Sequence, residues 1–484
     1  MPEGNRYSRT PAKARRLGQI LLGITAVSAI LQLAYVLVFT HNQPWADEWE
    51  FIPTLCGQES VGKYLWAQHN EHRMPLPRGI WLALFHLTHD FRAGAILQVA
   101  IYSALAFAGL RWAAELRGEP SWTDLFFPLS LLHVGHSENL LMGYQLCFAF
   151  ACLFVIGLAR LAMRAKPENR IRTAFFASIL SAALCLCGGF GAVFSLPAMV
   201  WIWYLTLVPL SPGGSGVKGE GVFPDIPTSP PAPPQPGAKQ RCAKFAIAIF
   251  SLFPLVYLGF YFQDYHRPEA HPPFEWKNWF AAAQVTMEVL AIGFGIGVDL
   301  WGEIARSFDL QRGYLWVPVF FGILYASYLV VAEGIHRFRN IPVEGPRVFG
   351  WVAVCVGVCG LALAIGAGRS GFGPDFGLWP RYSILTWPLL AVFYFSAVAW
   401  GGPKLKFIPT AFVLASLILY PVNTAYGVAR GWYHNQWLGT IETMLLNGVP
   451  DAVIVKEQIE ETGQGDRAIL GIPMLREKKI GPFR

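Results

Sequence analysis

Residues 17–40 read LGQILLGITAVSAILQLAYVLVFT, which is 24 residues without a charge. At 1.5 Å per residue, a helix of this length crosses the roughly 30 Å of hydrocarbon in a bilayer. The stretch is too long for the core of a signal peptide, and no small-x-small cleavage site follows it. It therefore predicts an uncleaved membrane anchor at the start of a membrane-embedded chain.

The rest of the chain has the same apolar character. Of its 484 residues, 54% are hydrophobic and 14% are charged, and the mean hydropathy is +0.39. A soluble globular protein carries about 25% charged residues, so the composition predicts an all-α integral membrane protein. Seven further charge-free runs of 18 to 21 residues are each long enough for one span, namely 93–110, 140–159, 245–262, 314–332, 348–368, 382–402 and 407–425.

Two other regions extend the count of spans. Residues 173–210 form a 38-residue charge-free run, which is too long for one helix in a bilayer. The sequence GGFG at 188–191 interrupts the run and predicts a hairpin of two spans; no Lys or Ser/Thr follows it in the pattern of a phosphate loop. Residues 125–134 predict a short span that rises to a polar mouth. The total is about eleven crossings, within a range of 10–13.

The bias of Lys and Arg predicts the orientation. Five cations and one acidic residue precede the first span, so we expect a cytoplasmic N-terminus and a non-cytoplasmic C-terminus in a bacterial-type cytoplasmic membrane. This alternation requires residues 279–298, which contain Glu288, to dip into the membrane without crossing it. The net charge of +7 favours contact with anionic membrane lipids and not with nucleic acid.

The chain divides into four predicted parts. Residues 1–210 form an N-terminal half with a long first outer loop at 41–92. Residues 211–240 contain eight Pro and six Gly and predict a flexible to semi-stiff cytoplasmic linker. Residues 241–426 form the C-terminal half, and residues 427–484 form a polar outer tail. Within the tail, 440–446 and 452–461 predict short helices, and 469–476 an irregular or strand-like end.

Polar residues concentrate in the first outer loop, at 45–50 (WADEWE) and 68–73 (QHNEHR). Ionisable groups beside a membrane are costly, which makes them candidates for function. On the predicted topology they share one face with residues from distant span ends, as in many active sites. The candidate site residues are Asp47, Glu48, Glu71, His72, Arg73, Glu138, Asn139, Arg369, Arg381 and Tyr382.

An acidic pair after the first span, a long first outer loop with an amphipathic helix, about eleven spans and an outer tail together resemble the C-type-fold membrane glycosyltransferases. The tail and the Asn-Glu-His-Arg and Ser-Glu-Asn patches are similar to uncharacterised bacterial membrane proteins grouped with that superfamily. The resemblance implies a sugar donor linked to a polyprenyl phosphate or diphosphate, with an acidic residue of the first outer loop as base. It leaves the acceptor open among a glycan, a lipid and a protein.

The residues suit that chemistry. A carboxylate takes the proton of the attacking hydroxyl; Asp47 matches the position of the superfamily's acid, and Glu48 is its alternate. Arginine binds two phosphate oxygens at once, so Arg73, Arg369 and Arg381 are candidates for the lipid phosphate. One base implies inversion at the anomeric carbon, whereas Glu71 or Glu138 as nucleophile would give retention.

Each candidate also has a structural alternative. The acidic pair lies between two tryptophans typical of an interfacial aromatic belt. Glu71 and Arg73 suit an ion pair, and Glu138 suits a helix cap. Arg369 and Arg381 also suit interface anchors. No cofactor is assigned, although a divalent metal bound by His69, His72 and Asp47 is one alternative.

The alternative function is a transporter or flippase for a lipid-linked or amphiphilic substrate, and a binding-only scaffold is a third possibility. Transporters place ionisable groups near the middle of the membrane, whereas here the spans are nearly free of charge.

Overall fold

The computed structural model describes residues 11–208, 238–268, 271–299 and 316–484. Within these ranges every regular element is a helix, and the one bridge between extended residues pairs His69 with His72. The all-α class predicted from the sequence is confirmed for these residues. Most of the predicted linker 211–240 lies outside the described residues.

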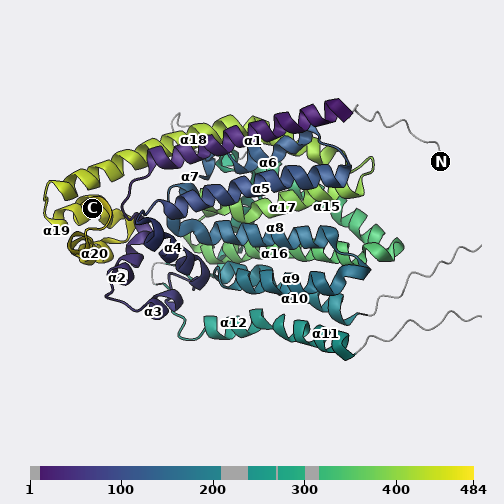
Figure 1. The fold of residues 1–484 in the computed structure, drawn as a ribbon, viewed down its shortest axis with the longest axis horizontal. Coiled ribbons are helices and arrows are strands. Elements are labelled where there is room, and N and C mark those ends of the chain that lie inside the picture. Colours follow the sequence, from purple (N-terminus) through teal and green to yellow (C-terminus); the bar gives the residue numbers. More distant parts are fainter. Residues whose placement is uncertain (1–10, 209–237, 269–270, 300–315) are drawn as a thin grey trace, which may run out of the picture.

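The long helices run along the long axis of the molecule, with α1 and α18 side by side along one edge and α11 and α12 at the other (Figure 1). In the described ranges nine helical stretches are long and apolar enough to cross a membrane, so the chain is a multi-pass membrane protein. The bundle helices are α1 (Pro11–Phe39), α5 (Ala93–Arg117), α8 (Leu146–Arg164), α9 (Arg170–Cys185), α10 (Gly189–Leu207), α11 (Ala238–Phe250), α12 (Phe253–Tyr261), α13 (Trp279–Ala291), α15 (Trp316–Asn340), α16 (Gly345–Arg369), α17 (Ser383–Trp400) and α18 (Phe407–Leu446).

Residues 125–134 do not form the short span that the sequence predicts. They fold into the six-residue helix α6 (Phe126–Leu131), followed by the single turn η3 (Val134–His136). Six residues extend only about 9 Å. Their apolar side chains are buried inside the bundle, where the Ser130 hydroxyl accepts a hydrogen bond from the indole of Trp387. The apolar run therefore reflects burial in protein, and without this span the predicted total of about eleven crossings falls to ten, the lower end of the predicted range.

The predicted hairpin at 173–210 is present as the antiparallel pair α9 and α10. The chain turns at Gly188, whose φ of 135° favours glycine. Gly191 then packs directly against the end of α9, where a Cβ would lie 1.7 Å from the carbonyl oxygen of Leu184. The glycines interrupt the apolar run because the turn and the close approach of the two helices both exclude a side chain.

We call the end of the bundle that carries residues 41–92 the loop end. α12 reaches the loop end, where the Tyr261 hydroxyl contacts the backbone of Glu71. α15 runs toward the opposite end, where Arg337 donates to the carbonyl of Trp400. Between them lie α13 and the turns η7 (Ile292–Phe294) and η8 (Ile296–Asp299). That 279–298 makes no net crossing stays a prediction, because residues 300–315, which join this segment to α15, lie outside the described ranges.

The loop end is covered by short helices from both ends of the chain (Figure 1). Residues 41–92 form the turn η1 (Ala46–Phe51) and the helices α2 (Ile52–Leu55), α3 (Val61–Trp66) and α4 (Pro75–Thr88). The tail contributes α19 (Asp451–Ile454) and α20 (Gly465–Lys478), which follow the projecting end of α18. α20 packs on η1 and α2.

The tail differs from the sequence-based expectation in two places. α18 is one helix of 40 residues, about 60 Å long, so 440–446 is not a separate helix. Residues 469–476, expected to be irregular or strand-like, lie inside α20. The buried residues Ala468, Gly471, Ile472 and Leu475 follow the helical spacing. The prediction was wrong because the apolar run is short and contains a proline at 473, which is uncommon inside a helix.

We expect Gly191→Ala to destabilise the bundle, because its methyl group would overlap the backbone of α9. Overpacking of this kind costs about 1–3 kcal/mol or more. Gly23→Ala in α1 is the matched control, since nothing lies within 4 Å of its Cβ position and alanine is the better helix former. Thermal unfolding in detergent measures both; equal melting temperatures for the two variants would contradict the close approach of α9 and α10.

Candidate functional site

A cavity of about 370 Å³ lies at the loop end of the bundle. Its walls come from the loop 41–92, from α8, α10, α12, α16 and α17, and from residues flanking these helices. The lining residues are Asp47, His69, Asn70, Glu71, His72, Met74, Tyr144, Gln145, Cys147, Phe148, Gly189, Phe190, Ala192, Val193, Leu196, Leu258, Tyr261, Phe262, Tyr265, Leu361, Ala364, Ile365, Gly368, Arg369, Arg381, Tyr382 and Leu385.

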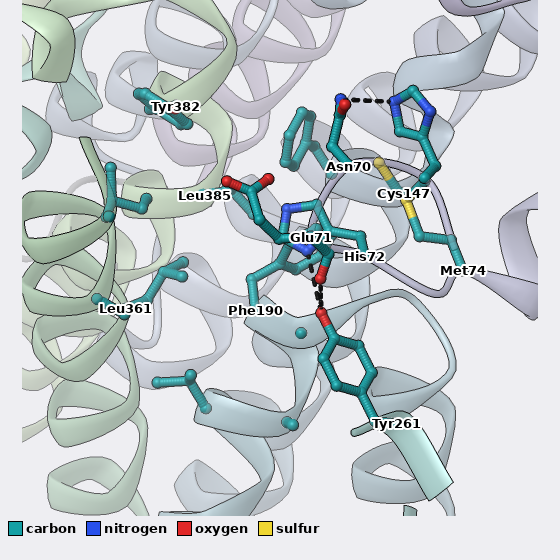
Figure 2. Close-up of a pocket in the computed structure, with 18 of the residues that line it drawn as sticks. Asn70, Glu71, His72, Met74, Cys147, Phe190, Tyr261, Leu361, Tyr382 and Leu385 are labelled. Carbon is teal, nitrogen blue, oxygen red and sulfur yellow. Dashed lines mark hydrogen bonds between the residues drawn. The ribbon is translucent and has the colours of Figure 1, made fainter. Parts of the chain in front are cut away.

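The lining has two chemically different parts. The ionisable side chains come from the loop and from the ends of α16 and α17, and they form the head of the cavity. The remaining walls are mostly aliphatic and aromatic, as Figure 2 shows for Phe190, Leu361 and Leu385. Phe262 lines the cavity and is also 59% exposed on the outer surface of the bundle. The apolar part therefore adjoins the surface that faces lipid.

Asp47 lies at the head of the cavity on the turn η1. Its Oδ1 accepts a hydrogen bond from Gln464 at 3.0 Å, and its Oδ2 lies 3.6 Å from His69 Nε2. Burial acts to raise the pKa of Asp47, but His69, as a donor and as a cation, outweighs burial and lowers it, with help from Arg381 and Arg467. Asp47 is thus an ionised carboxylate at neutral pH.

Glu50 connects this part of the site, although nothing in the local sequence distinguishes it from its acidic neighbours. Its side chain is only 9% exposed. Oε1 lies 2.5 Å from His69 Nδ1 and 2.5 Å from Arg467 Nη1, and Oε2 lies 2.8 Å from Arg78 and 3.3 Å from the hydroxyl of Tyr144. Arg78 was likewise not among the site residues predicted from the sequence. A cation on the apolar face of α4 is the signal that identifies it.

His69 lies between two carboxylates. Burial acts to lower the pKa of His69, but the charges of Glu50 and Asp47 outweigh it and raise the pKa to about 9. The same burial acts to raise the pKa of Glu50, and the charges of His69, Arg467 and Arg78 lower it. At neutral pH the three side chains therefore form a carboxylate–imidazolium–carboxylate arrangement.

Glu48, the predicted alternate base, does not line the cavity. Its side chain is buried and accepts backbone N–H bonds from Trp45 at 3.0 Å and from Gly143 at 2.8 Å. Burial raises the pKa of Glu48 to about 8 against these hydrogen bonds. Because neighbouring residues of a tight turn point in different directions, the side chains of Asp47 and Glu48 diverge. Glu48 has a structural role, since it binds η1 to the segment before α8.

Glu71 and His72 both line the cavity, as predicted. The carboxylate of Glu71 lies 3.3 Å from Arg369 and also contacts His271, and burial, which acts to raise the pKa of Glu71, is outweighed by the charge of Arg369. Burial lowers the pKa of His72 to about 4, so this imidazole is neutral. Figure 2 shows Glu71 and His72 together, with the Tyr261 hydroxyl directed at the backbone of Glu71.

Arg73, predicted to bind phosphate, points away from the cavity and is buried. It donates to the carbonyl oxygens of Tyr261 at 3.1 Å, Trp66 at 2.7 Å and Gln263 at 2.7 Å. It does not pair with Glu71, so the alternative of an Arg73–Glu71 ion pair is also wrong. Arg73 instead ties the loop 41–92 to the end of α12, because carbonyls at the C-terminal ends of α12 and α3 lack intrahelical donors.

Arg381 and Tyr382 open α17 and line the cavity. Arg381 lies 2.6 Å from Glu138 and stacks over the ring of Trp379 at 4.4 Å, while its buried Nε has no hydrogen-bond partner among the described residues. Glu138 also accepts the backbone N–H of Arg381, and Asn139 donates to its carbonyl oxygen. Glu138 and Asn139 therefore act through Arg381 and are not themselves on the cavity wall.

The described residues contain no group of three His, Cys, Asp or Glu side chains arranged to hold a metal ion. His69 Nδ1 lies 2.5 Å from Glu50, and its Nε2 lies 3.0 Å from Asn70 Nδ2 and 3.6 Å from Asp47. His72 packs against Phe190 and Tyr261. The proposed set of His69, His72 and Asp47 does not converge on one point.

No family model, curated protein or solved structure matches this chain. The assignment of the site therefore rests on its own geometry and chemistry.

We expect the melting temperature to fall as the pH rises through about 9. The folded-state pKa of His69 is raised above its ordinary value of 6.5, so its stabilising contribution is complete below 6.5 and is lost as the pH rises through the folded-state pKa. Thermal unfolding from pH 6 to pH 10 tests this. Below pH 8 the buried Glu48, whose pKa is raised to about 8 by burial, contributes to the same fall, so His69→Gln should lose the dependence above pH 8. If the wild type and His69→Gln curves run parallel there, the imidazolium is not held by these carboxylates.

Proposed function

We propose that this protein is a membrane glycosyltransferase of the C-type fold. It transfers a sugar from a polyprenyl-phosphate donor to an acceptor hydroxyl at the loop end, which we assign to the outer face of a bacterial-type cytoplasmic membrane. The observation that carries the proposal is the two-part lining of the cavity, with ionised side chains at its head and apolar walls below. A ligand that suits both parts is an amphiphile with an anionic head.

The apolar part supports a hydrocarbon chain. The α12 region contributes Leu258 and Phe262 to the cavity wall, and α16 contributes Leu361, Ala364 and Ile365. Since Phe262 is also exposed on the outer surface, a lipid tail bound here continues past it into the bilayer. Burial of such a chain contributes about 0.8 kcal/mol for each CH₂ removed from water, but a donor already in a bilayer gains less.

The two arginines of the cavity support a phosphate head. Arg369 and Arg381 come from opposite ends of the segment that joins α16 to α17, and each is held by one carboxylate, Glu71 and Glu138 respectively. A guanidinium has five N–H donors, so each arginine has N–H donors beyond those that its carboxylate accepts. Charge that develops on the leaving phosphate is stabilised by such preorganised cations.

Asp47 is the candidate base. In the proposed reaction an acceptor hydroxyl attacks the anomeric carbon, the bond from that carbon to the phosphate oxygen breaks, the polyprenyl phosphate leaves, and the hydroxyl proton passes to Asp47. Its ionised state at neutral pH is the state that accepts a proton. Glu71 also lines the cavity, but its ion pair with Arg369 makes it a less available nucleophile, so we favour inversion over retention.

The competing proposal is a transporter or flippase for the same kind of amphiphile. A transport path requires polar groups along the depth of the membrane, whereas the ionisable residues that line this cavity lie at its head. The two functions differ in chemistry, because only the transferase requires Asp47 to exchange a proton.

We expect Asp47→Asn to lower the rate of sugar transfer by about 10²–10⁴-fold, the range for loss of a general base, with little change in melting temperature. The assay follows release of undecaprenyl phosphate from a panel of synthetic undecaprenyl-phosphate hexoses and pentoses. Glu48→Gln is the matched control: it should lower the melting temperature, because a buried N–H loses its acceptor, while folded protein keeps its turnover. Full activity of Asp47→Asn would remove the proposed base.

We expect Arg369→Gln and Arg381→Gln each to weaken binding of undecaprenyl phosphate by roughly 10-fold or more, since a hydrogen bond to a charged group contributes about 1.5–3 kcal/mol. Arg476→Gln is the control, because Arg476 pairs with Asp451 away from the cavity. Native mass spectrometry or tryptophan fluorescence measures the affinity. Equal affinity in all three variants would mean that the phosphate binds elsewhere.

A further inference from the structure

Helix α20 reaches the back of the turn that carries Asp47. Its apolar face, which includes Ala468 and Ile472, is buried. At Gly471 a Cβ would lie 3.1 Å from the ring of Trp49 and 3.4 Å from Ile52. This close fit brings the first turn of the helix, with Gln464 and Arg467, against η1.

Five side chains form a polar chain at this contact, and its two ends, His69 and Asp47, lie 3.6 Å apart. Gln464 Nε2 donates to Asp47 Oδ1 at 3.0 Å, and Arg467 Nη1 donates to Gln464 Oε1 at 2.8 Å. Arg467 Nη1 also lies 2.5 Å from Glu50 Oε1. Glu50 Oε1 lies 2.5 Å from His69 Nδ1, and His69 Nε2 lies 3.6 Å from Asp47 Oδ2. Three members come from the first loop and two from the tail.

The order of donors and acceptors determines how each group is oriented. Arg467 has donors only, so the amide oxygen of Gln464 faces Arg467 and its NH₂ group faces Asp47. His69 Nδ1 faces Glu50, and its Nε2 lies 3.0 Å from Asn70 Nδ2 and 3.6 Å from Asp47 Oδ2. Gln464 therefore holds one oxygen of Asp47, Oδ1, by a direct hydrogen bond. Neither Gln464 nor Arg467 lines the cavity, so any effect they have on bound substrate passes through Asp47.

We propose that Gln464 and Arg467 are positioning residues for Asp47, and that the C-terminal helix α20 is therefore an integral part of the transferase site. The inference rests on the proposed function. It adds that the carboxylate is aimed by a segment more than 400 residues away in sequence, since Gln464 and Asp47 are separated by 417 residues. A displacement of about 1 Å in such a group costs on the order of 100-fold in rate.

The hydrogen bond between Gln464 and Asp47 is tested first, by a measurement that needs no sugar donor. Gln464→Glu places a carboxylate against Asp47 Oδ1, with His69, Arg381 and Arg467 as the charged neighbours of Asp47. Two adjacent carboxylates resist joint ionisation, so the melting temperature of this variant, relative to wild type, should be lower at pH 8 than at pH 5. Glu477→Gln, an exposed change on the same helix, should follow wild type at both pH values. A Gln464→Glu difference that does not vary with pH would overturn the contact.

The positioning role is tested by kinetics. Gln464→Ala and Arg467→Ala should lower kcat for release of undecaprenyl phosphate by about 10-fold or more, while KM and the Kd for undecaprenyl phosphate change less than about two-fold, because the cavity wall is intact. Arg467→Lys keeps a cation that donates to Gln464 and Glu50, so it should recover most of the activity lost in Arg467→Ala. A purely structural role would instead change activity in step with the folded fraction.

The outcomes separate this inference from the proposed function. If Asp47→Asn is inactive but Gln464→Ala keeps the wild-type kcat, positioning by α20 is wrong and the base assignment stands. If the wild type neither binds undecaprenyl phosphate nor releases it from a donor, or if Asp47→Asn is fully active, the proposed function fails and this inference fails with it.

Discussion

The loop end of this protein depends on the need to neutralise one nearly buried carboxylate, Glu50. An ionised carboxylate withdrawn from water costs several kcal/mol unless charged partners compensate. The partners of Glu50 come from four segments: His69 from the first loop, Arg78 from α4, Tyr144 from the turn before α8, and Arg467 from α20. These segments have no common strand or sheet to align them, so the shared carboxylate is what draws them to one point.

The same constraint organises the cavity. With His69 held as a cation by Glu50, Asp47 is kept ionised at the head of the cavity. On the other side, Glu71 and Glu138 each hold one arginine in place. Every charge on the wall thus has a partner before any ligand arrives, and the charges are preorganised and not recruited. This pattern suits catalysis or binding of an anionic head group beside an apolar chain.

Much of the scaffold could be predicted from sequence, because charge-free runs of 18 residues or more have few other uses. The convergence of Asp47, Glu71, Arg369 and Arg381 could also be predicted, since two lie in the first outer loop and two at ends of predicted spans on the same face. The orientation of individual side chains could not be predicted: Glu48 and Arg73 are neighbours of residues that line the cavity, but their own side chains face the protein interior. The span predicted at 125–134 was wrong because an apolar run does not distinguish a lipid-facing helix from a buried one. Nothing in the sequence near Gln464 and Arg467 indicates their distant partners.

The position of helix α20 near the end of the chain determines the order in which the loop end is assembled. A ribosome delivers the first loop, with Asp47, Glu50 and His69, hundreds of residues before it delivers Gln464 and Arg467. Until then Glu50 lacks Arg467, one of its charged partners, and Asp47 lacks the donor that fixes one of its oxygens. The loop end of the molecule is consequently completed last, after all of the helices that frame the cavity have been made.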